Sequence, residues 1–379
     1  MHKIIGLAFV LLSVATNSYA SPQSDAKLIN ATINNLMHKR AIPGAAVVLY
    51  KDGKLSYYYF GTREHNQDLP VDINSVFEIG SITKTFTGLL LAQGVDGGKL
   101  NFADTIPFSG LSKSFKKVTL LNLATFSASL PYDLDYIPYD AANSNKYQVL
   151  LDKFMSIWRA GNPIGSHFAY SNLSFGVLGK VIEYKEKTKL DKLMQAQIFN
   201  PLKMEHTYFI VPESQYVNYA QGYDANNHLD RTPRDGLYAG SFALKSSVGD
   251  MAKYLEASLL LPSIPPVIAH GIKVAQSGYY MMNQGRGIGL GWFIIPLDRN
   301  YEVLPERKSR NPKGLKRITK PTYNPHNLIE KSGATNGFRA YIAVIPQRKI
   351  GIVILVNKFT SNVKEFDGTG RNLLTDLNK

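Results

Sequence analysis

Strand-forming segments lie near both ends of this 379-residue chain, while helix-forming segments fill the middle. Five segments are apolar and rich in β-branched or aromatic residues: 45–50, 55–60, 290–296, 338–345 and 350–356. Asp52-Gly53 separates the first two and is typical of a tight hairpin turn, and residues 346–349 connect the last two. Because the two groups lie far apart in the sequence, we expect the ends of the chain to meet in one antiparallel sheet.

Apolar residues recur at helical spacing through the middle of the chain. These segments are about 82–94, 118–126, 146–159, 173–185, 189–198, 247–261 and 265–276, with further helices expected near 28–37 and 363–377. Residues 205–240 show little periodicity and predict a long surface loop. We therefore predict an α/β (α+β) fold: residues 21–80 and 285–379 form an antiparallel sheet flanked by helices, and residues 81–284 form a mostly helical lobe. Active sites commonly lie in crevices between such lobes.

The first 20 residues have the features of a secretion signal. Lys3 precedes an apolar run at residues 4–14, and Ser18 and Ala20 are small residues at the two positions that a signal peptidase reads. The run is shorter than the roughly 20 apolar residues of a membrane span, and no later segment is long and apolar enough. We expect residues 1–20 to be removed after Ala20, and the mature chain to be secreted without a membrane span.

The chain contains no cysteine, which excludes disulfides, thiolate metal sites and a cysteine nucleophile. Its formal net charge is +14, or +13 once the signal segment, with Lys3 and no acid, is removed. Part of the excess lies at 305–320, whose basic residues are Arg307, Lys308, Arg310, Lys313, Lys316, Arg317 and Lys320. Pro305, Pro312 and Gly314 predict a loop there, which is either simply solvated or a patch that binds anions. No nucleic-acid-binding motif accompanies it, so we expect no nucleic-acid partner.

Residues 77–84 form the strongest candidate for catalytic chemistry. Gly80 is suited to the entry of a helix, and if Ser81 lies in the first turn, Lys84 lies one turn later on the same face. A serine hydroxyl becomes a useful nucleophile when a neighbour takes its proton, and a partly buried lysine can be that neighbour. The same spacing recurs at Ser24/Lys27, Ser114/Lys117 and Ser361/Lys364. Ser81 differs because it alone follows a glycine and opens a long apolar helix.

The second candidate motif is Tyr170-Ser171-Asn172, just before a predicted helix. A tyrosine near a lysine ammonium loses its proton more easily and can act as a base. An asparagine side chain offers both a donor and an acceptor at a fixed place. Alone, the motif is equally compatible with a tyrosine that packs at a helix start.

The third motif, Lys331-Ser332-Gly333, occurs once in the chain. A lysine and a hydroxyl at a strand edge can hold a substrate carboxylate, and the glycine lets another backbone approach closely. Alone, it is compatible with the start of a surface strand. The three motifs together, in this order and in these contexts, predict a single site.

The order Ser-x-x-Lys, Tyr-x-Asn and Lys-Ser/Thr-Gly resembles the penicillin-recognising serine enzymes. The finer resemblance is to class C β-lactamases, and it runs from about residue 25 to the end of the chain. The segments that carry it are 77–88, 120–125, 331–338, 341–346 and 351–358. It implies a β-lactamase/transpeptidase-like fold, a monomeric periplasmic enzyme without metal or cofactor, and a small β-lactam substrate. Peptidoglycan peptides are the alternative ligands.

The resemblance also implies catalytic roles. Ser81 attacks the lactam carbonyl and forms an acyl-enzyme. Lys84 and Tyr170 share the proton transfers and activate the water that releases the product; which of them is the base stays open, because coupled groups titrate as a pair. The backbone N–H groups of Ser81 and Ala334 form the oxyanion hole.

The substrate-binding residues that the resemblance implies lie in four segments. They are Asp133, Asn172, Lys331, Ser332, Gly333, Ala334, Thr335 and Asn362. Lys331 and Thr335 meet the substrate carboxylate, with Asn362 as a further contact. Asn172 binds the amide of the acyl side chain.

Three positions depart from the class C pattern. Asp133 stands where a glutamine usually helps to hold the substrate amide, and it adds a negative charge without an amide donor. Phe242 stands where a tyrosine usually lines the pocket, and Glu330 precedes Lys331 where histidine is common. These departures concern the substrate profile more than the chemistry.

Other functions remain open on the same scaffold. A D-alanyl-D-alanine carboxypeptidase or a small-ester hydrolase begins with the same acylation and differs in how fast water clears the acyl-enzyme. A non-hydrolysing penicillin-binding sensor or cell-wall-binding module has no need of Ser81, Lys84 and Tyr170 together. Class A β-lactamases fit less well, because they carry Ser-Asp-Asn at the second motif, and the chain contains no Gly-x-Ser-x-Gly or His-Glu-x-x-His motif.

Overall fold

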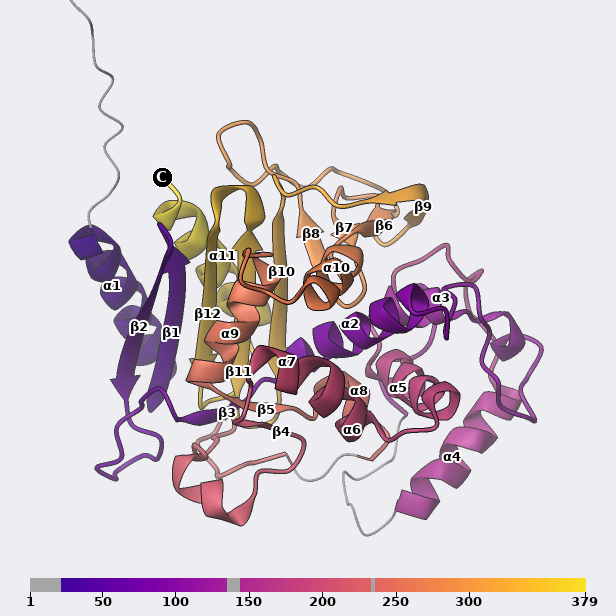
Figure 1. The fold of residues 1–379 in the computed structure, drawn as a ribbon, viewed down its shortest axis with the longest axis horizontal. Coiled ribbons are helices and arrows are strands. Elements are labelled where there is room, and N and C mark those ends of the chain that lie inside the picture. The colour runs from indigo at the N-terminus through magenta and orange to yellow at the C-terminus, as the bar shows by residue number, and fades with distance from the viewer. Residues whose placement is uncertain (1–21, 135–143, 233–235) are drawn as a thin grey trace, which may run out of the picture.

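The computed structural model describes residues 22–134, 144–232 and 236–379, so the predicted signal segment lies outside the described residues. The described chain forms a nine-stranded antiparallel sheet with helices on both faces and a mostly helical region beside it (Figure 1). The strand order is β2-β1-β12-β11-β10-β8-β7-β6-β9. The strands are β1 (Gly44–Lys51), β2 (Lys54–Gly61), β6 (Gly278–Met282), β7 (Gly287–Ile288), β8 (Phe293–Ile295), β9 (Leu315–Thr322), β10 (Leu328–Ala334), β11 (Arg339–Ile345) and β12 (Ile350–Val356).

The two ends of the chain meet in this sheet, which confirms the predicted fold. β1 pairs with β12 in antiparallel register, beginning with Ala45 opposite Val356. The turn between β1 and β2 has a φ of 51° at Asp52 and 78° at Gly53. Positive φ at both central residues is the turn geometry whose twist matches two antiparallel strands.

Helices cover both faces of the sheet because its central strands are apolar on both. The covering helices are α1 (Pro22–Arg40) and α11 (Val363–Leu377) on one face and α9 (Val248–Ser258) on the other (Figure 1). Along β12, Ile352 and Ile354 join the hydrophobic cluster under α1 and α11, whereas Val353 and Leu355 join the cluster on the α9 side. The alternation of side chains along a strand thus builds two cores from one sheet.

The helical region surrounds α2 (Thr83–Asp96), which is buried along most of its length. The other helical elements are η1 (Gly80–Ile82), η2 (Phe115–Lys117), α3 (Leu120–Ala124), α4 (Ser144–Ile157), α5 (Asn172–Glu186), α6 (Leu190–Met194), η4 (Gln195–Phe199), α7 (Asn200–Leu202), η5 (Glu213–Asn218), α8 (Ala239–Phe242) and α10 (Pro266–Ala275). α2 packs against α5, α8 and α10, so it is apolar on several sides rather than on one stripe. None of the described helices is long and apolar enough to cross a membrane.

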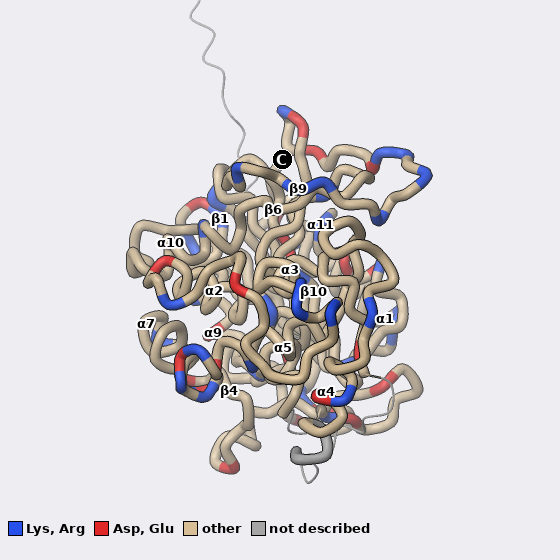
Figure 2. Tube along the Cα trace, turned by 90° about the vertical axis from the view of Figure 1, so that its right-hand side faces the viewer, with Lys and Arg blue, Asp and Glu red and all other residues tan. Residues whose placement is uncertain are grey.

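The basic segment at 305–320 was predicted to be a loop over its whole length, but part of it is a strand. Residues 315–320 belong to β9, which is the edge strand of the sheet next to β6. Figure 2 shows lysine and arginine gathered along β9 and the loop before it. An edge strand can keep charged side chains in water, and such charges discourage pairing with another chain. The sequence pattern did not predict this strand because its exposed lysines and arginines interrupt the run of apolar residues.

Short elements connect the sheet to the helical region. Residues 205–240, predicted as a surface loop, hold η5 and the two-residue strand β4 (Thr207–Tyr208). β4 joins β3 (Val76–Glu78) and β5 (Lys245–Ser247) in a second sheet of three strands. The predicted boundary at residue 285 falls between β6 and β7, which pair with each other. Each of these strands is too short to show a period in the sequence.

A buried ion pair fastens α11 to the sheet. Glu330 on β10 accepts hydrogen bonds from Arg371 on α11, with an Nε–Oε2 distance of 2.9 Å, and from the hydroxyl of Tyr341 at 2.7 Å. Both members of the ion pair have little exposure. Glu330 therefore points to the face of the sheet that α11 covers. Lys331, the next residue along β10, points to the opposite face.

We expect Glu330→Ala to lower the free energy of unfolding by about 3 kcal/mol, because it leaves a buried guanidinium without its counterion. Urea denaturation of the purified protein measures this. Glu213→Ala, which removes an exposed carboxylate from η5, should leave the midpoint nearly unchanged. Equal midpoints for the two variants would contradict a stabilising role of the pair.

Candidate active site

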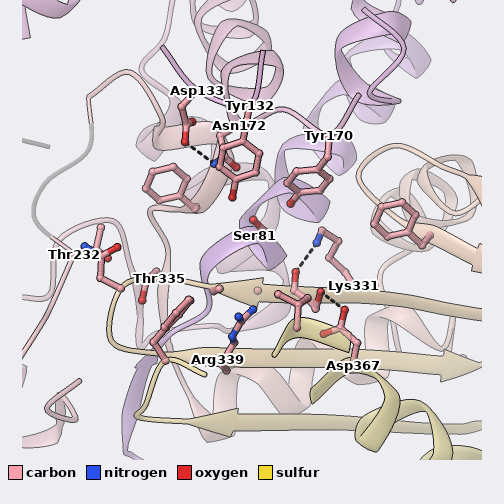
Figure 3. Close-up of a pocket in the computed structure, with 18 residues that line it drawn as sticks. Ser81, Tyr132, Asp133, Tyr170, Asn172, Thr232, Lys331, Thr335, Arg339 and Asp367 are labelled. Atoms are coloured by element: carbon pink, nitrogen blue, oxygen red, sulfur yellow. Dashed lines mark hydrogen bonds between the residues drawn. The ribbon is translucent and has the colours of Figure 1, made fainter. Parts of the chain in front are cut away.

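A cavity of about 480 Å³ lies between the end of β10 and the helical region. Its walls include most of the residues predicted for the site: Ser81, Asp133, Tyr170, Asn172, Lys331, Ser332, Gly333, Ala334 and Thr335. Figure 3 shows Ser81 and Tyr170 facing Lys331 across the cavity. Three motifs that are far apart in the sequence therefore meet in one place.

Ser81 lies in a turn that is pressed against the end of β10. Gly80, just before it, has a φ of +50°, and a methyl group there would lie 2.5 Å from the backbone nitrogen of Ala334. A methyl group on Gly333 would lie 1.9 Å from the carbonyl oxygen of Ile79 and 3.1 Å from the backbone nitrogen of Ser81. Only glycine fits at both positions. The contact brings the backbones of Ser81 and Ala334 together, as an oxyanion hole requires.

Lys84 is fully buried one helical turn after Ser81. Its Nζ donates hydrogen bonds to Ser81 Oγ at 3.0 Å, to Asn172 Oδ1 at 2.7 Å and to the carbonyl oxygen of Ser241 at 3.0 Å. Three acceptors match the three protons of an ammonium group. Lys84 thus holds both the candidate nucleophile and Asn172 in place.

Tyr170 stands between two lysines. The Nζ atoms of Lys84 and Lys331 lie 5.1 Å and 5.3 Å from the centre of its ring, which stacks on Phe126 at 4.6 Å. Burial raises the pKa of the phenol well above its ordinary value, although the interaction with Ser81 opposes this shift. The phenol therefore keeps its proton at neutral pH.

Lys331 is a buried cation whose pKa is lowered to about 8, mainly by burial, while the charge of Asp367 opposes the shift. Its Nζ donates to the carbonyl oxygen of Ser332. The hydroxyl of Ser332 donates to Asp367 Oδ2 at 2.9 Å. Ser332 is therefore tied to α11, while Lys331 faces the cavity.

Two predicted substrate contacts have other partners in this structure. Asn362 is exposed and caps α11, where its Oδ1 accepts from the backbone nitrogen of Glu365 at 3.1 Å. It is not among the described residues that line the cavity. Asp133 does line it, and its Oδ2 accepts from Asn172 Nδ2 at 3.3 Å. Of the other two positions that depart from the class C pattern, Phe242 is part of the cavity wall.

The cavity also contains residues that the motifs did not identify, notably Arg339, Asp367, Tyr132 and Phe293. Arg339 opens an otherwise apolar strand, and a single charge in such a run is a signal that it has a special role. Asp367 lies on α11, and nothing in its sequence surroundings marks it. Its place in the cavity follows only from the packing of α11 on β10.

The comparisons with known proteins agree with this geometry. The family model "Beta-lactamase" matches residues 29–377. A beta-lactamase of Pseudomonas fluorescens is 30% identical over 348 residues, which cover 89% of this chain and 95% of that enzyme. A solved class C beta-lactamase has a TM-score of 0.82 at 25% identity and covers 95% of this chain and 98% of that one. A solved D-alanine carboxypeptidase AmpC of Burkholderia cenocepacia has a TM-score of 0.80 at 25% identity, covering 94% and 100%.

We expect Gly333→Ala to lower the free energy of unfolding by about 2 kcal/mol or more, because the new methyl group meets backbone atoms that cannot move separately. Thermal or urea unfolding measures the loss. Gly368→Ala on α11 is the matched control: a methyl group there meets no atom within 4 Å, and alanine favours a helix. A Gly333→Ala protein as stable as the wild type would show that β10 does not press on the Ser81 turn.

Proposed function

We infer that this chain, which belongs to the beta-lactamase family, is a class C-type serine hydrolase that opens β-lactams through an acyl-enzyme on Ser81. The observation that carries this inference is the hydrogen bond from the buried Lys84 of α2 to Oγ of Ser81, which lies in η1 and lines the cavity. A serine so placed has an activating neighbour and a helix N-terminus, which favours developing negative charge. The relatives supply the substrate class.

Acylation uses the groups on both sides of Ser81. Its Oγ bonds to the lactam carbonyl carbon, and the carbonyl oxygen gains negative charge facing the backbone N–H groups of Ser81 and Ala334. The C–N bond then breaks, and the nitrogen takes a proton. As Oγ attacks, the proton of Ser81 passes to the Lys84–Tyr170 pair, and this pair gives a proton to the lactam nitrogen, so no net proton is gained or lost.

Deacylation reverses the proton path. A water molecule attacks the ester carbon and passes its proton to the Tyr170–Lys84 pair, and Ser81 Oγ leaves with a proton from that pair. The two groups are coupled, so a pH–rate profile reports the pair rather than either residue. Lys331 and Thr335 face the end of the cavity where the substrate carboxylate is proposed to lie.

A D-alanine carboxypeptidase is the second candidate. The likeness to the Burkholderia cenocepacia carboxypeptidase favours it, although that likeness is no closer than the one to class C beta-lactamases. Both functions share the acylation of Ser81. They differ in the rate at which water clears the acyl-enzyme, so the kinetics with a β-lactam separate them.

We also propose that the chain is exported to the periplasm. The support is the sequence of residues 1–20, with a basic start, an apolar run and small residues before Ser21. Mass spectrometry of the protein from a periplasmic extract should give a chain that begins at Ser21. A full-length chain confined to the cytoplasm would contradict the proposal.

We expect the mature protein to hydrolyse many equivalents of a chromogenic cephalosporin, and Ser81→Ala to lower kcat by about 10⁴-fold or more. Ser114→Ala is the matched control, because Ser114 has the same spacing to a lysine but makes no capping bond and lies outside the cavity. Its activity should equal that of the wild type. A single burst of one equivalent in the wild type would favour the carboxypeptidase or a sensor, and full activity of Ser81→Ala would remove Ser81 from the mechanism.

We expect KM for a carboxylate-bearing cephalosporin to rise by up to about tenfold between pH 7 and pH 9. The pKa of Lys331 is lowered to about 8, so the side chain is a cation below this pH and loses its charge above it. The methyl ester of the same cephalosporin is the control, since it has no carboxylate for Lys331 to bind. A parallel rise for the ester, or a flat KM for both, would count against this assignment.

A further inference from the structure

Arg339 is a buried cation on the wall of the cavity that none of the three motifs contains. It is 3% exposed, at the start of β11. Its Nε and Nη2 both donate to the carbonyl oxygen of Thr360, with an Nε–O distance of 2.9 Å, and its guanidinium carbon lies 4.7 Å from the ring centre of Phe359. Within the described chain, these contacts leave Nη1 without a hydrogen bond.

No acidic side chain of the described residues forms an ion pair with this guanidinium. The charge of Asp367 favours the charged form of Arg339, but Asp367 Oδ2 accepts a hydrogen bond from Ser332. A carbonyl oxygen and an aromatic ring only partly offset the cost of burying a charge. A buried cation with a free donor in the wall of a cavity is suited to an anionic ligand.

The position of Arg339 is close to the reacting centre. It lies opposite Ala334 in the pairing of β10 with β11, and Ala334 is three residues after Lys331. Figure 3 shows the guanidinium pointing up toward the cavity, below Ser81 and between Thr335 and Asp367. The two cations thus reach the cavity from neighbouring strands.

We propose that Arg339, through Nη1, binds the carboxylate of the substrate together with Lys331, as the further contact that the family resemblance implies for Asn362. This rests on the proposed function and adds a specificity-determining residue to it. The ligand class is an acyl compound with a carboxylate beside the amide nitrogen that leaves. Because an arginine stays charged where Lys331 loses its proton, Arg339 keeps part of this selectivity at alkaline pH.

The test compares Arg339→Gln, Arg339→Lys and the wild type on a cephalosporin and its methyl ester. We expect Arg339→Gln to lower kcat/KM for the carboxylate about 10- to 100-fold, mostly through KM, and to change kcat/KM for the ester less than about threefold. Arg339→Lys should recover part of the preference for the carboxylate. Arg348→Gln, at an exposed arginine that bonds Asn378, is the control and should match the wild type.

A second measurement separates this inference from the proposed function. Calorimetric titration in the Ser81→Ala background gives Kd for the same two ligands without any turnover, and the Arg339→Gln change should weaken binding of the carboxylate alone. Equal losses for both ligands, or no loss for either, would overturn the role of Arg339 even if the enzyme is an active β-lactamase. Selective loss of binding in a protein without turnover would support the subsite while the proposed function fails.

Discussion

The close contact between the Ser81 turn and the end of β10 is the constraint on which the rest of the site depends. Gly80 and Gly333 have no side chains, so two backbones from opposite parts of the chain lie against each other. This contact joins the buried α2 to the sheet and sets the distance between the nucleophile and the strand that carries Lys331. The cavity lies where the sheet and the helical region meet.

Charge in the site is arranged around this contact. Lys84 is held by three acceptors, one of them Ser81 Oγ, while Lys331 has a carbonyl oxygen and two aromatic rings around it. The two lysines are therefore suited to different work. Lys84 holds Ser81 and Asn172 in place, and Lys331, with its lowered pKa, is the cation that we propose binds the substrate carboxylate.

The three positions that depart from the class C pattern differ in their surroundings: one lies outside the cavity and two line it. Glu330 lies on the α11 face of the sheet and is matched by Arg371, so its effect on the site is through the position of β10. Asp133 and Phe242 line the cavity itself and can contact a substrate directly. Arg339, which is not one of these three positions, also lines the cavity.

The sequence by itself determined the strands at both ends, the helices between them and the three motifs, because each is recorded in a local pattern of apolar, turn-forming or reactive residues. Ser81 and Lys84, one helical turn apart, are an example, and so is the turn at Asp52-Gly53. Only the tertiary structure decided that Asn362 caps α11 and that Arg339 and Asp367 enter the cavity. These placements depend on how α11 packs against β10 and β11, and a contact between segments that are distant in sequence leaves no periodic trace in either of them.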